Sequence, residues 1–499
     1  MSATVKVHPL TGEPKSQPAA RQDLFTLSTT VRPRRSIDAS YDAARDTDEF
    51  KNYWANADSF DADSANSKAV RQKLVTRSRY EAANNGYVDG ILQTFANFLV
   101  GVGPKLRMLT GNAQFNQAVE TVWQQWAKKI KLRRKLWVMA HAKMQDGESF
   151  AVVRTNPKIK HPVKLDIVPF ETEQCQSLTT YWGTPDRIDG IKFDEFGNPE
   201  TYEVLRYHPG GQWFPVANWQ AEEVPAKYML HWFMLRRPGQ HRGVPELRST
   251  LNVGASSRRY REATVAAAET VAEMGAVLLK TDMPPGEADP ASPFSGYPMQ
   301  RRMITAMPAG WDAMQMKPEH PTANYSEFVE SQIGESARPK NMPLNIAMCN
   351  SSKYNYASGR LDHQTFFASL DSEREDGNDL VLDQLFELFW EEAVLAYGWN
   401  ADPENQPAHG WDWPKHPVAD RVSDAEADDI QLKNGSKSLR RVVQEGGDDL
   451  ADEIPQMAED YGQPEEKVRE AVFHANFNAQ NQLASIAQAS NATATAGSA

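Results

Sequence analysis

The chain has 499 residues, of which about 40% are apolar and 24% charged, so it can bury more than one core without a disulfide or metal. Its net charge of −12 argues against tight sequence-independent DNA binding, which needs Lys and Arg on phosphates, but permits a surface that DNA slides past. We expect the two cysteines, Cys175 and Cys349, to be reduced thiols of a cytoplasmic product. No segment has the ~18 apolar residues of a membrane span, and Met1 to Ala20 lack a signal core.

The first third of the chain predicts an extended arm followed by two helical regions. Residues 1–36 are rich in Pro, Gln and Thr, which favours a disordered arm. Apolar residues at three- and four-residue spacing predict a helix over 67–100, stopped by Gly101 and Gly103. A second helix is predicted over 115–140. Its basic half, KKIKLRRK, is interpreted as a solvated face, with contact to phosphate as the alternative.

Residues 149–232 carry β-rich runs, with a turn at Gly197, and indicate a mixed α/β region. An Ala-rich segment without proline predicts a helix over 246–280, thin in apolar residues, of the kind that packs between neighbours. Residues 281–322 are rich in Pro and Met and predict a protruding module or long loop. A further helix should begin at Asn324 as N-cap.

The last third predicts an irregular polar segment, a long helix and a charged helical end. Residues 344–360 show no regular apolar spacing, and a helix is expected from about Leu361 to Tyr397 with a weak point at Gly377. Short charged helices follow, separated by Gly435 and Gly446. From about Ala484 the composition predicts a disordered tail that is dispensable for assembly.

The sequence contains no GxxxxGK[ST], HExxH or GxSxG motif, so no motif of a nucleotide site, zinc helix or nucleophile elbow is present. His231 lies in the apolar run MLHWFML and is interpreted as a core histidine rather than a metal ligand. Asp146 and Glu148 flank Gly147 and are interpreted as structural acids on a turn. Scattered carboxylates still permit a metal-dependent nuclease, whose ligands would assemble in three dimensions.

Several short motifs, in order over residues 35–460, together resemble the lambda-type family of tailed-phage portal proteins. The most specific is RPGQHRGVP at residues 237–245, close to the family's RPGQxRGVP. The others are YDAA at 41–44 before Trp54, RSR at 77–79 with NN at 84–85 and VGVG at 100–103, DGE at 146–148, the DxxGxPxxY…HPG hairpin of 194–210, YNYASGR at 354–360, and the NG and GGD elements of 425–448. Ala357 departs from the serine usual in the NYSSxR element.

The resemblance implies an α+β portal-type fold assembled as a ring, typically of twelve subunits, around a channel for double-stranded DNA. It implies the following segments: an arm at 1–36, an α/β wing at 37–245, stem helices at 246–280 and 323–343, a clip at 281–322, a tunnel loop at 344–360, a tunnel helix with wing return at 361–417, a crown at 418–483 and a tail at 484–499.

The partners implied by the resemblance are the terminase large subunit, head-completion or adaptor proteins, and the major capsid and scaffold proteins at one capsid vertex of the virion. No cofactor, metal or membrane is implied, and the packaging energy would come from the terminase because the phosphate loop is missing. The competing hypotheses are a nucleic-acid-processing enzyme such as a metal-dependent nuclease, and an adaptor that binds other proteins without a channel.

Two groups of site residues follow from the resemblance. The tunnel loop is expected to expose side chains to DNA, with Lys353 touching phosphate lightly; a surface connector with Lys353 in solvent is the alternative. Its residues are Asn350, Ser351, Ser352, Lys353, Tyr354 and Asn355. The residues expected to shape the structure through the family motifs are Arg237, Gln240, Arg242, Gly243, Pro245, Tyr356 and Arg360.

Overall fold

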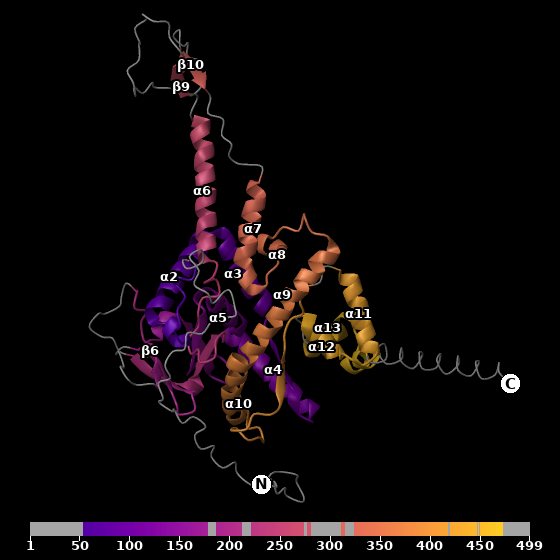
Figure 1. The fold of residues 1–499 in the computed structure, drawn as a ribbon. Coiled ribbons are helices and arrows are strands. Elements are labelled where there is room, and N and C mark those ends of the chain that lie inside the picture. The colour runs from indigo at the N-terminus through magenta and orange to yellow at the C-terminus, as the bar shows by residue number, and fades with distance from the viewer. Residues whose placement is uncertain are drawn as a thin grey trace, which may run out of the picture. The chain divides into compact units, whose positions relative to one another are not determined.

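A computed structural model describes residues 53–177, 186–211, 221–273, 277–280, 311–314, 324–417, 420–446, 448 and 450–472. The chain divides into two units, Met1–Ser59 and Phe60–Ala499. In the first, the described residues form a turn in which the Ala57 amide donates to the Trp54 carbonyl at 2.9 Å. The predicted arm at 1–36 and tail at 484–499 lie outside the described residues. The helices and strands of the described residues all belong to the second unit (Figure 1).

The N-terminal helices of this unit contribute one part of its main core. They are α1 (Ala62–Ala65), α2 (Lys68–Asn84), α3 (Gly86–Val100), α4 (Ala113–Ile130) and α5 (Leu132–Asp146), and they reach the main core through α3, α4 and α5. The helix predicted over 67–100 is divided at Asn85, whose extended backbone ends α2 and whose side chain caps α3. The predicted stop is confirmed, because Gly101 and Gly103 both have positive φ.

The helix predicted over 115–140 is also divided. Lys131 adopts the left-handed conformation, with φ 58°, which ends α4 and starts α5 in the middle of the basic run. Around this corner the apolar side chains Trp126, Ile130 and Leu132 are buried, whereas the cations face solvent. The basic run is therefore a corner between two helices rather than one continuous helical face.

The mixed α/β region contains two antiparallel sheets. One has the order β3-β2-β8 and the other the order β4-β5-β6-β7. Their strands are β2 (Glu148–Thr155), β3 (Leu165–Phe170), β4 (Arg187–Ile188), β5 (Ile191–Phe193), β6 (Pro199–Leu205), β7 (Ala221–Pro225) and β8 (Met229–Phe233). The 3-10 turns Thr172–Gln174 and Ala226–Tyr228 follow β3 and β7. The turn predicted before Pro199 is confirmed, since the Gly197 amide donates to the Asp194 carbonyl at 3.1 Å.

The segment after the sheets corrects the prediction of a helix over 246–280. Helix α6 spans Leu251–Glu273, and Val277–Lys280 forms strand β9, paired antiparallel with β10 (Trp311–Met314). The apolar run Val277 to Leu279 finds its partner strand more than thirty residues downstream, which an Ala-rich composition does not reveal.

Helix α7 (Tyr325–Ala337) confirms the helix predicted after Asn324, although the Asn324 side chain makes no capping hydrogen bond. It packs beside α6, as Figure 1 shows, through Tyr260, whose ring stacks on Tyr325 and meets the edge of Phe328. A 3-10 turn, Arg338–Lys340, follows it directly.

The long helix of the C-terminal half begins five residues earlier than predicted and contains the predicted weak point. Helix α9 (Tyr356–Gly377) continues through one π-helical stretch, Asn378–Leu382, into α10 (Asp383–Tyr397). Gly377 lies against the Trp232 ring, where a β-carbon would be 3.0 Å from the nearest ring atom. The π-helical stretch begins directly after this glycine.

The remaining elements close the fold. Strand β1 (Lys105–Met108) pairs with β11 (His409–Asp412), and the charged end forms α11 (Arg421–Lys433), α12 (Leu439–Gly446) and α13 (Leu450–Tyr461). An aromatic cluster of Trp123, Trp126, Phe386 and Phe389 joins α4 to α10 inside the main core. No helix among the described residues is both long and apolar enough to cross a membrane. The architecture is α+β, and the described strands pair antiparallel in each sheet.

Candidate functional site

Two of the motifs singled out in the sequence meet in one buried ionic cluster. The carboxylate of Glu148, at the start of β2, accepts hydrogen bonds from the Arg242 guanidinium at 2.6 Å and 3.0 Å and from the Gly243 amide at 2.8 Å. His231, on β8, adds a contact at 3.2 Å. Glu148 and Arg242 are each about 1% exposed, so this pairing takes place without bulk water.

Two further charges complete the buried ionic cluster. Arg71, on α2, pairs with Asp189 and lies 3.7 Å from the Glu148 carboxylate. Arg242 also donates to the carbonyl oxygens of Cys175 and Asp189. Two guanidinium groups thus face two carboxylates. Burial alone would raise the pKa of Glu148, but Arg242, His231 and Arg71 together hold this pKa well below its ordinary value.

The backbone of the two motifs approaches so closely that only glycine fits. Gly147 has φ 93°, and a β-carbon there would lie 2.1 Å from the Val244 carbonyl carbon. A β-carbon on Gly243 would lie 2.2 Å from the Gly147 carbonyl oxygen. The DGE turn and the RPGQHRGVP segment therefore form one interlocked unit. Glu148 pairs with Arg242, and Asp146 accepts from Arg79 at 2.7 Å and 2.9 Å, which confirms the interpretation of both as structural acids.

The other motif residues predicted from the sequence lie either in the RPGQHRGVP segment or at the start of α9. The Gln240 side chain accepts from the Arg236 amide at 3.1 Å and donates to the Arg242 carbonyl at 2.9 Å, and Pro245 is buried nearby. Arg237 is exposed and donates to the Phe60 carbonyl at 2.9 Å. Tyr356 and exposed Arg360 lie at the start of α9, away from this unit, and the Tyr356 side chain is outside the description.

A second buried ionic cluster was not predicted. Glu373, on α9, pairs with Lys143 of α5 and, at 2.5 Å, with Lys340; Lys340 in turn lies 3.5 Å from Glu246. Arg236 pairs with the other oxygen of Glu246. Three cations thus share two carboxylates, and burial, with repulsion from Lys340, lowers the pKa of Lys143 to about 7. No sequence motif marks these residues, which come from four distant segments.

The predicted tunnel loop is partly helical, which corrects the irregular structure expected over 344–360. Helix α8 covers Leu344–Met348 and ends at Cys349 in the left-handed conformation. Asn350, Ser351, Ser352, Lys353 and Asn355 are exposed, and Tyr354 is half-buried. The Asn355 side chain accepts from the Ser358 amide at 2.8 Å and so caps α9. The irregular part is therefore short and presents polar side chains to solvent.

Lys353 is exposed over 63% of its side chain but is paired. Its ammonium group contacts both carboxylate oxygens of Glu330, on α7, at 2.7 Å and 2.8 Å. This pair holds the short loop against α7. The sequence did not suggest Glu330, because the two residues are 23 positions apart in different elements.

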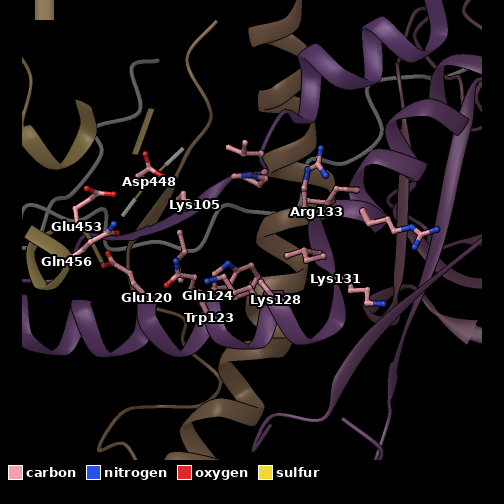
Figure 2. A pocket seen from close by; sticks show the side chains of 18 residues that line it. Lys105, Glu120, Trp123, Gln124, Lys128, Lys131, Arg133, Asp448, Glu453 and Gln456 are labelled. Atoms are coloured by element: carbon pink, nitrogen blue, oxygen red, sulfur yellow. The ribbon is translucent and has the colours of Figure 1, made fainter. Parts of the chain in front are cut away.

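A pocket of about 600 Å³ lies between the α4–α5 corner and the charged helical end (Figure 2). Lys128, Lys131 and Arg133 line one part of it, and Asp448 and Glu453 line another, with Lys105 near Asp448. Its apolar lining includes Trp123, Leu132 and Leu136.

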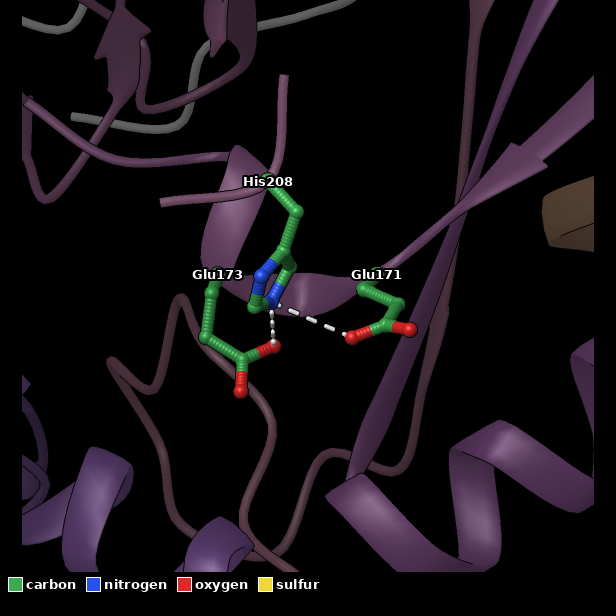
Figure 3. Close-up of side chains that lie close together, drawn as sticks. All are labelled: Glu171, Glu173 and His208. Atoms are coloured by element: carbon green, nitrogen blue, oxygen red, sulfur yellow. Dashed lines mark ion pairs between the residues drawn. The ribbon is translucent and has the colours of Figure 1, made fainter. Parts of the chain in front are cut away.

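Among the described residues one group has the spacing of a metal site: Glu171, Glu173 and His208 (Figure 3). His208 lies 3.1 Å from Glu171 and 3.6 Å from Glu173. Arg79 already donates to Glu173 through both terminal nitrogens, at 2.8 Å and 3.0 Å, and to Glu171 at 3.1 Å. A guanidinium occupies the position from which a cation would be bound, so the group is an ion-pair network.

The remaining side chains with possible chemistry have structural contacts. His231 is buried, stacked on Phe150 with ring centroids 4.2 Å apart, which confirms it as a core histidine. His241 contacts Asp63 at 2.7 Å, and His320 lies outside the described residues. Cys175 and Cys349 are free thiols, as predicted.

Comparison with known proteins agrees with the motifs. The family model described as phage portal protein, lambda family, matches residues 50–374. A probable portal protein of Halomonas phage phiHAP-1 is 22% identical over 489 residues, covering 90% of this chain and 88% of its own. The family match confirms the predicted resemblance, and its residues include both buried ionic clusters.

Two solved structures show likeness to this chain at low sequence identity. A chain from the virion of a native gene transfer agent particle is 12% identical, with TM-score 0.42, covering 74% of this chain and 90% of its own. An HK97-family phage portal protein from Corynebacterium diphtheriae is 13% identical, with TM-score 0.30, covering 62% and 93%.

Proposed function

The chain belongs to the lambda family of phage portal proteins, structural proteins of the virion rather than enzymes, and we propose that it is one subunit of a twelve-membered ring around a channel for double-stranded DNA. The observation that carries the proposal is the family match over residues 50–374. In this role the ring sits at one capsid vertex, where DNA enters during packaging and leaves during ejection.

Helix α6 supports the ring. It spans 23 residues, yet beyond Ser257 none of the residues from Arg258 to Glu269 is buried in the single subunit. Val265 is 57% exposed, and Phe328 on the adjacent α7 is 46% exposed. A helix of this kind gains little from packing inside one subunit. Neighbouring copies in a closed ring would cover it.

The tunnel loop is the proposed DNA-facing element of the channel. Its exposed part, Asn350 to Asn355, presents amides, hydroxyls and one paired cation, Lys353. Such a surface can contact phosphate through weak polar contacts without holding it. The pairing of Lys353 with Glu330 reduces its net attraction for DNA further, in keeping with a passage rather than a binding site.

The docking partners belong to the same proposal. Residues 281–322 follow strand β9 and include its partner strand β10, and they would present the clip to the terminase large subunit and later to head-completion or adaptor proteins. The charged helices α11 to α13 would form the crown. Contacts with major capsid and scaffold proteins would fix the ring in the shell.

Light scattering after size exclusion and negative-stain imaging test the ring. The purified full-length chain should elute with the mass of about twelve subunits and show a ring with a central hole. A monomer that stays monomeric at micromolar concentration across several salt conditions would contradict the proposal.

Nothing in the part of the chain that the structure describes favours the nuclease alternative. The candidate metal ligands Glu171 and Glu173 are held by Arg79. Hydrolysis of DNA by the purified protein, abolished by substitution of a single carboxylate and retained through contaminant controls, is the result that would reopen it.

A further inference from the structure

The corner between α4 and α5 carries five exposed cations within seven residues: Lys128, Lys129, Lys131, Arg133 and Arg134. The apolar residues between and beside them, Ile130 and Leu132, are each only 4% exposed. Burial of these two side chains anchors the corner and forces the charged side chains outward. We call this surface the cationic corner.

None of these five cations forms an ion pair with a carboxylate among the described residues, whereas two cations close to the corner do. Lys135, one position further, pairs with Asp166, and Arg440 pairs with Glu120. Arg133 donates to a backbone carbonyl instead, that of Gly101, at 2.8 Å. Like charges this close together repel one another, and in a chain of net charge −12 carboxylates were available to neutralise them.

The backbone conformation of Lys131 also distinguishes the cationic corner from an ordinary helix end. Lys131 has φ 58°, a conformation in which glycine is the favoured helix-ending residue and other residues cost about 1 kcal/mol. A cation stands there instead. Helix α5 also begins without a side-chain cap, so no polar side chain covers the positive end of the helix next to these residues.

The chemistry of the corner distinguishes between possible partners. Protein interfaces are centred on apolar or aromatic anchors that become buried. At the corner the apolar side chains are already buried in the subunit, and only long, flexible cations reach solvent. Such a surface suits a partner that is recognised through its charge alone. The phosphate backbone of double-stranded DNA is a partner of this kind.

We propose that the cationic corner is a second DNA contact of this protein, separate from the tunnel loop, which binds the phosphate backbone without sequence preference. It rests on the proposed function only in that DNA must come within reach of the subunit. The two surfaces differ in whether their cations are paired with a carboxylate. Lys353 is neutralised by Glu330, so DNA can pass it, whereas the corner cations, which pair with no described carboxylate, can hold phosphate.

The test is a titration of the full-length protein with a short fluorescent duplex, read by anisotropy at several salt concentrations. Lys128→Glu/Lys131→Glu is compared with Lys158→Glu/Lys160→Glu, which changes the same net charge at exposed lysines elsewhere. The corner variant should bind more than about tenfold more weakly, and the slope of log K against log salt should fall by roughly 0.9 for each phosphate that the protein no longer neutralises. The control should stay within about twofold of wild type.

Equal weakening in the two variants, or no binding of duplex by wild type at low salt, would overturn the proposal. If the corner variant binds DNA normally but is not incorporated into capsids, the partner is an acidic protein and the DNA assignment is wrong. The neutral variant Lys128→Gln/Lys131→Gln should give an intermediate decrease in affinity if both residues contact phosphate. Light scattering on the same samples reports the ring separately, so failure of the ring and failure of this contact are distinguishable.

Discussion

Glu148 and Arg242 lie 94 residues apart in the chain, yet their side chains form a bidentate, fully buried ion pair inside the mixed α/β region. This pair connects the start of β2 to the segment that leads into α6. Because α6 is the helix proposed to contact neighbouring subunits, the pair fixes the direction in which the ring-forming part leaves the sheets. Its role is therefore structural, and its substitution should act first on folding.

We predict that Arg242→Met lowers the free energy of unfolding by roughly 3–5 kcal/mol, because it leaves the Glu148 carboxylate buried beside a single, more distant guanidinium. Denaturant titration followed by circular dichroism measures the change. The matched control is Arg154→Met, which removes an exposed pair with Glu222 and should cost at most about 1 kcal/mol. Similar destabilisation in both variants would show that the buried pair contributes no more to stability than the exposed pair.

The interlocked backbone gives a second prediction. Gly147→Ala should prevent soluble expression or cost more than about 4 kcal/mol, since the new methyl group would meet the Val244 carbonyl carbon at 2.1 Å. Gly197→Ala is the control, because Gly197 has a similar φ of 84° but no atom within 4 Å of the position of a β-carbon. It should cost only about 1 kcal/mol. Thermal melts of the two variants compare the steric and conformational costs directly.

The second buried ionic cluster predicts a pH dependence. The folded-state pKa of Lys143 is lowered to about 7 from an ordinary value of 10.5, so between these values the unfolded chain binds more protons than the folded chain. The free energy of unfolding should therefore rise with pH across this window, by up to about 1.4 kcal/mol per pH unit. Lys143→Met removes one buried cation and should reduce this rise. The part that remains is expected from Lys340, whose pKa burial lowers to about 8.

Denaturant midpoints measured at several pH values between 7 and 10.5 test whether the free energy of unfolding rises with pH. Lys158→Met, at an exposed position, should keep the wild-type slope. A Lys143→Met profile parallel to wild type would mean that Lys143 stays charged in the folded protein, paired with Glu373.

The sequence predicted the elements better than it predicted their contacts. The apolar spacing of α3 and the β-rich runs are local patterns, so their positions were predictable, as was the weak point at Gly377. The helix expected over 246–280 was wrong at its end, because Val277–Lys280 takes its structure from a partner strand far along the chain. Local propensity cannot report a partner that distant.

Sequence patterns were equally limited in predicting the contacts of the two buried ionic clusters. The DGE and RPGQHRGVP motifs identified Glu148, Arg242 and Gly243 separately, but they did not predict that Glu148 is the shared partner of the other two, nor the supporting pair of Arg71 and Asp189. The cluster around Lys143 and Glu373 joins residues 230 positions apart and has no motif at all. Ion pairs between residues that only folding brings together have no characteristic spacing in the sequence.

The last prediction concerns Lys353 and the proposed channel. Lys353→Glu places a carboxylate opposite Glu330, so the loop is no longer held against α7, and acidic groups would face DNA if the loop lines the channel. Rings should still form, since an exposed substitution costs little stability. Packaging yield and genome retention should fall. Glu330→Gln is the control, because it also breaks the pair but leaves the lysine free, and it should keep packaging while slowing the passage of DNA. Wild-type yield and retention in Lys353→Glu particles would show that this residue does not face DNA, and an image of the ring with the loop on its outer rim would remove the placement itself.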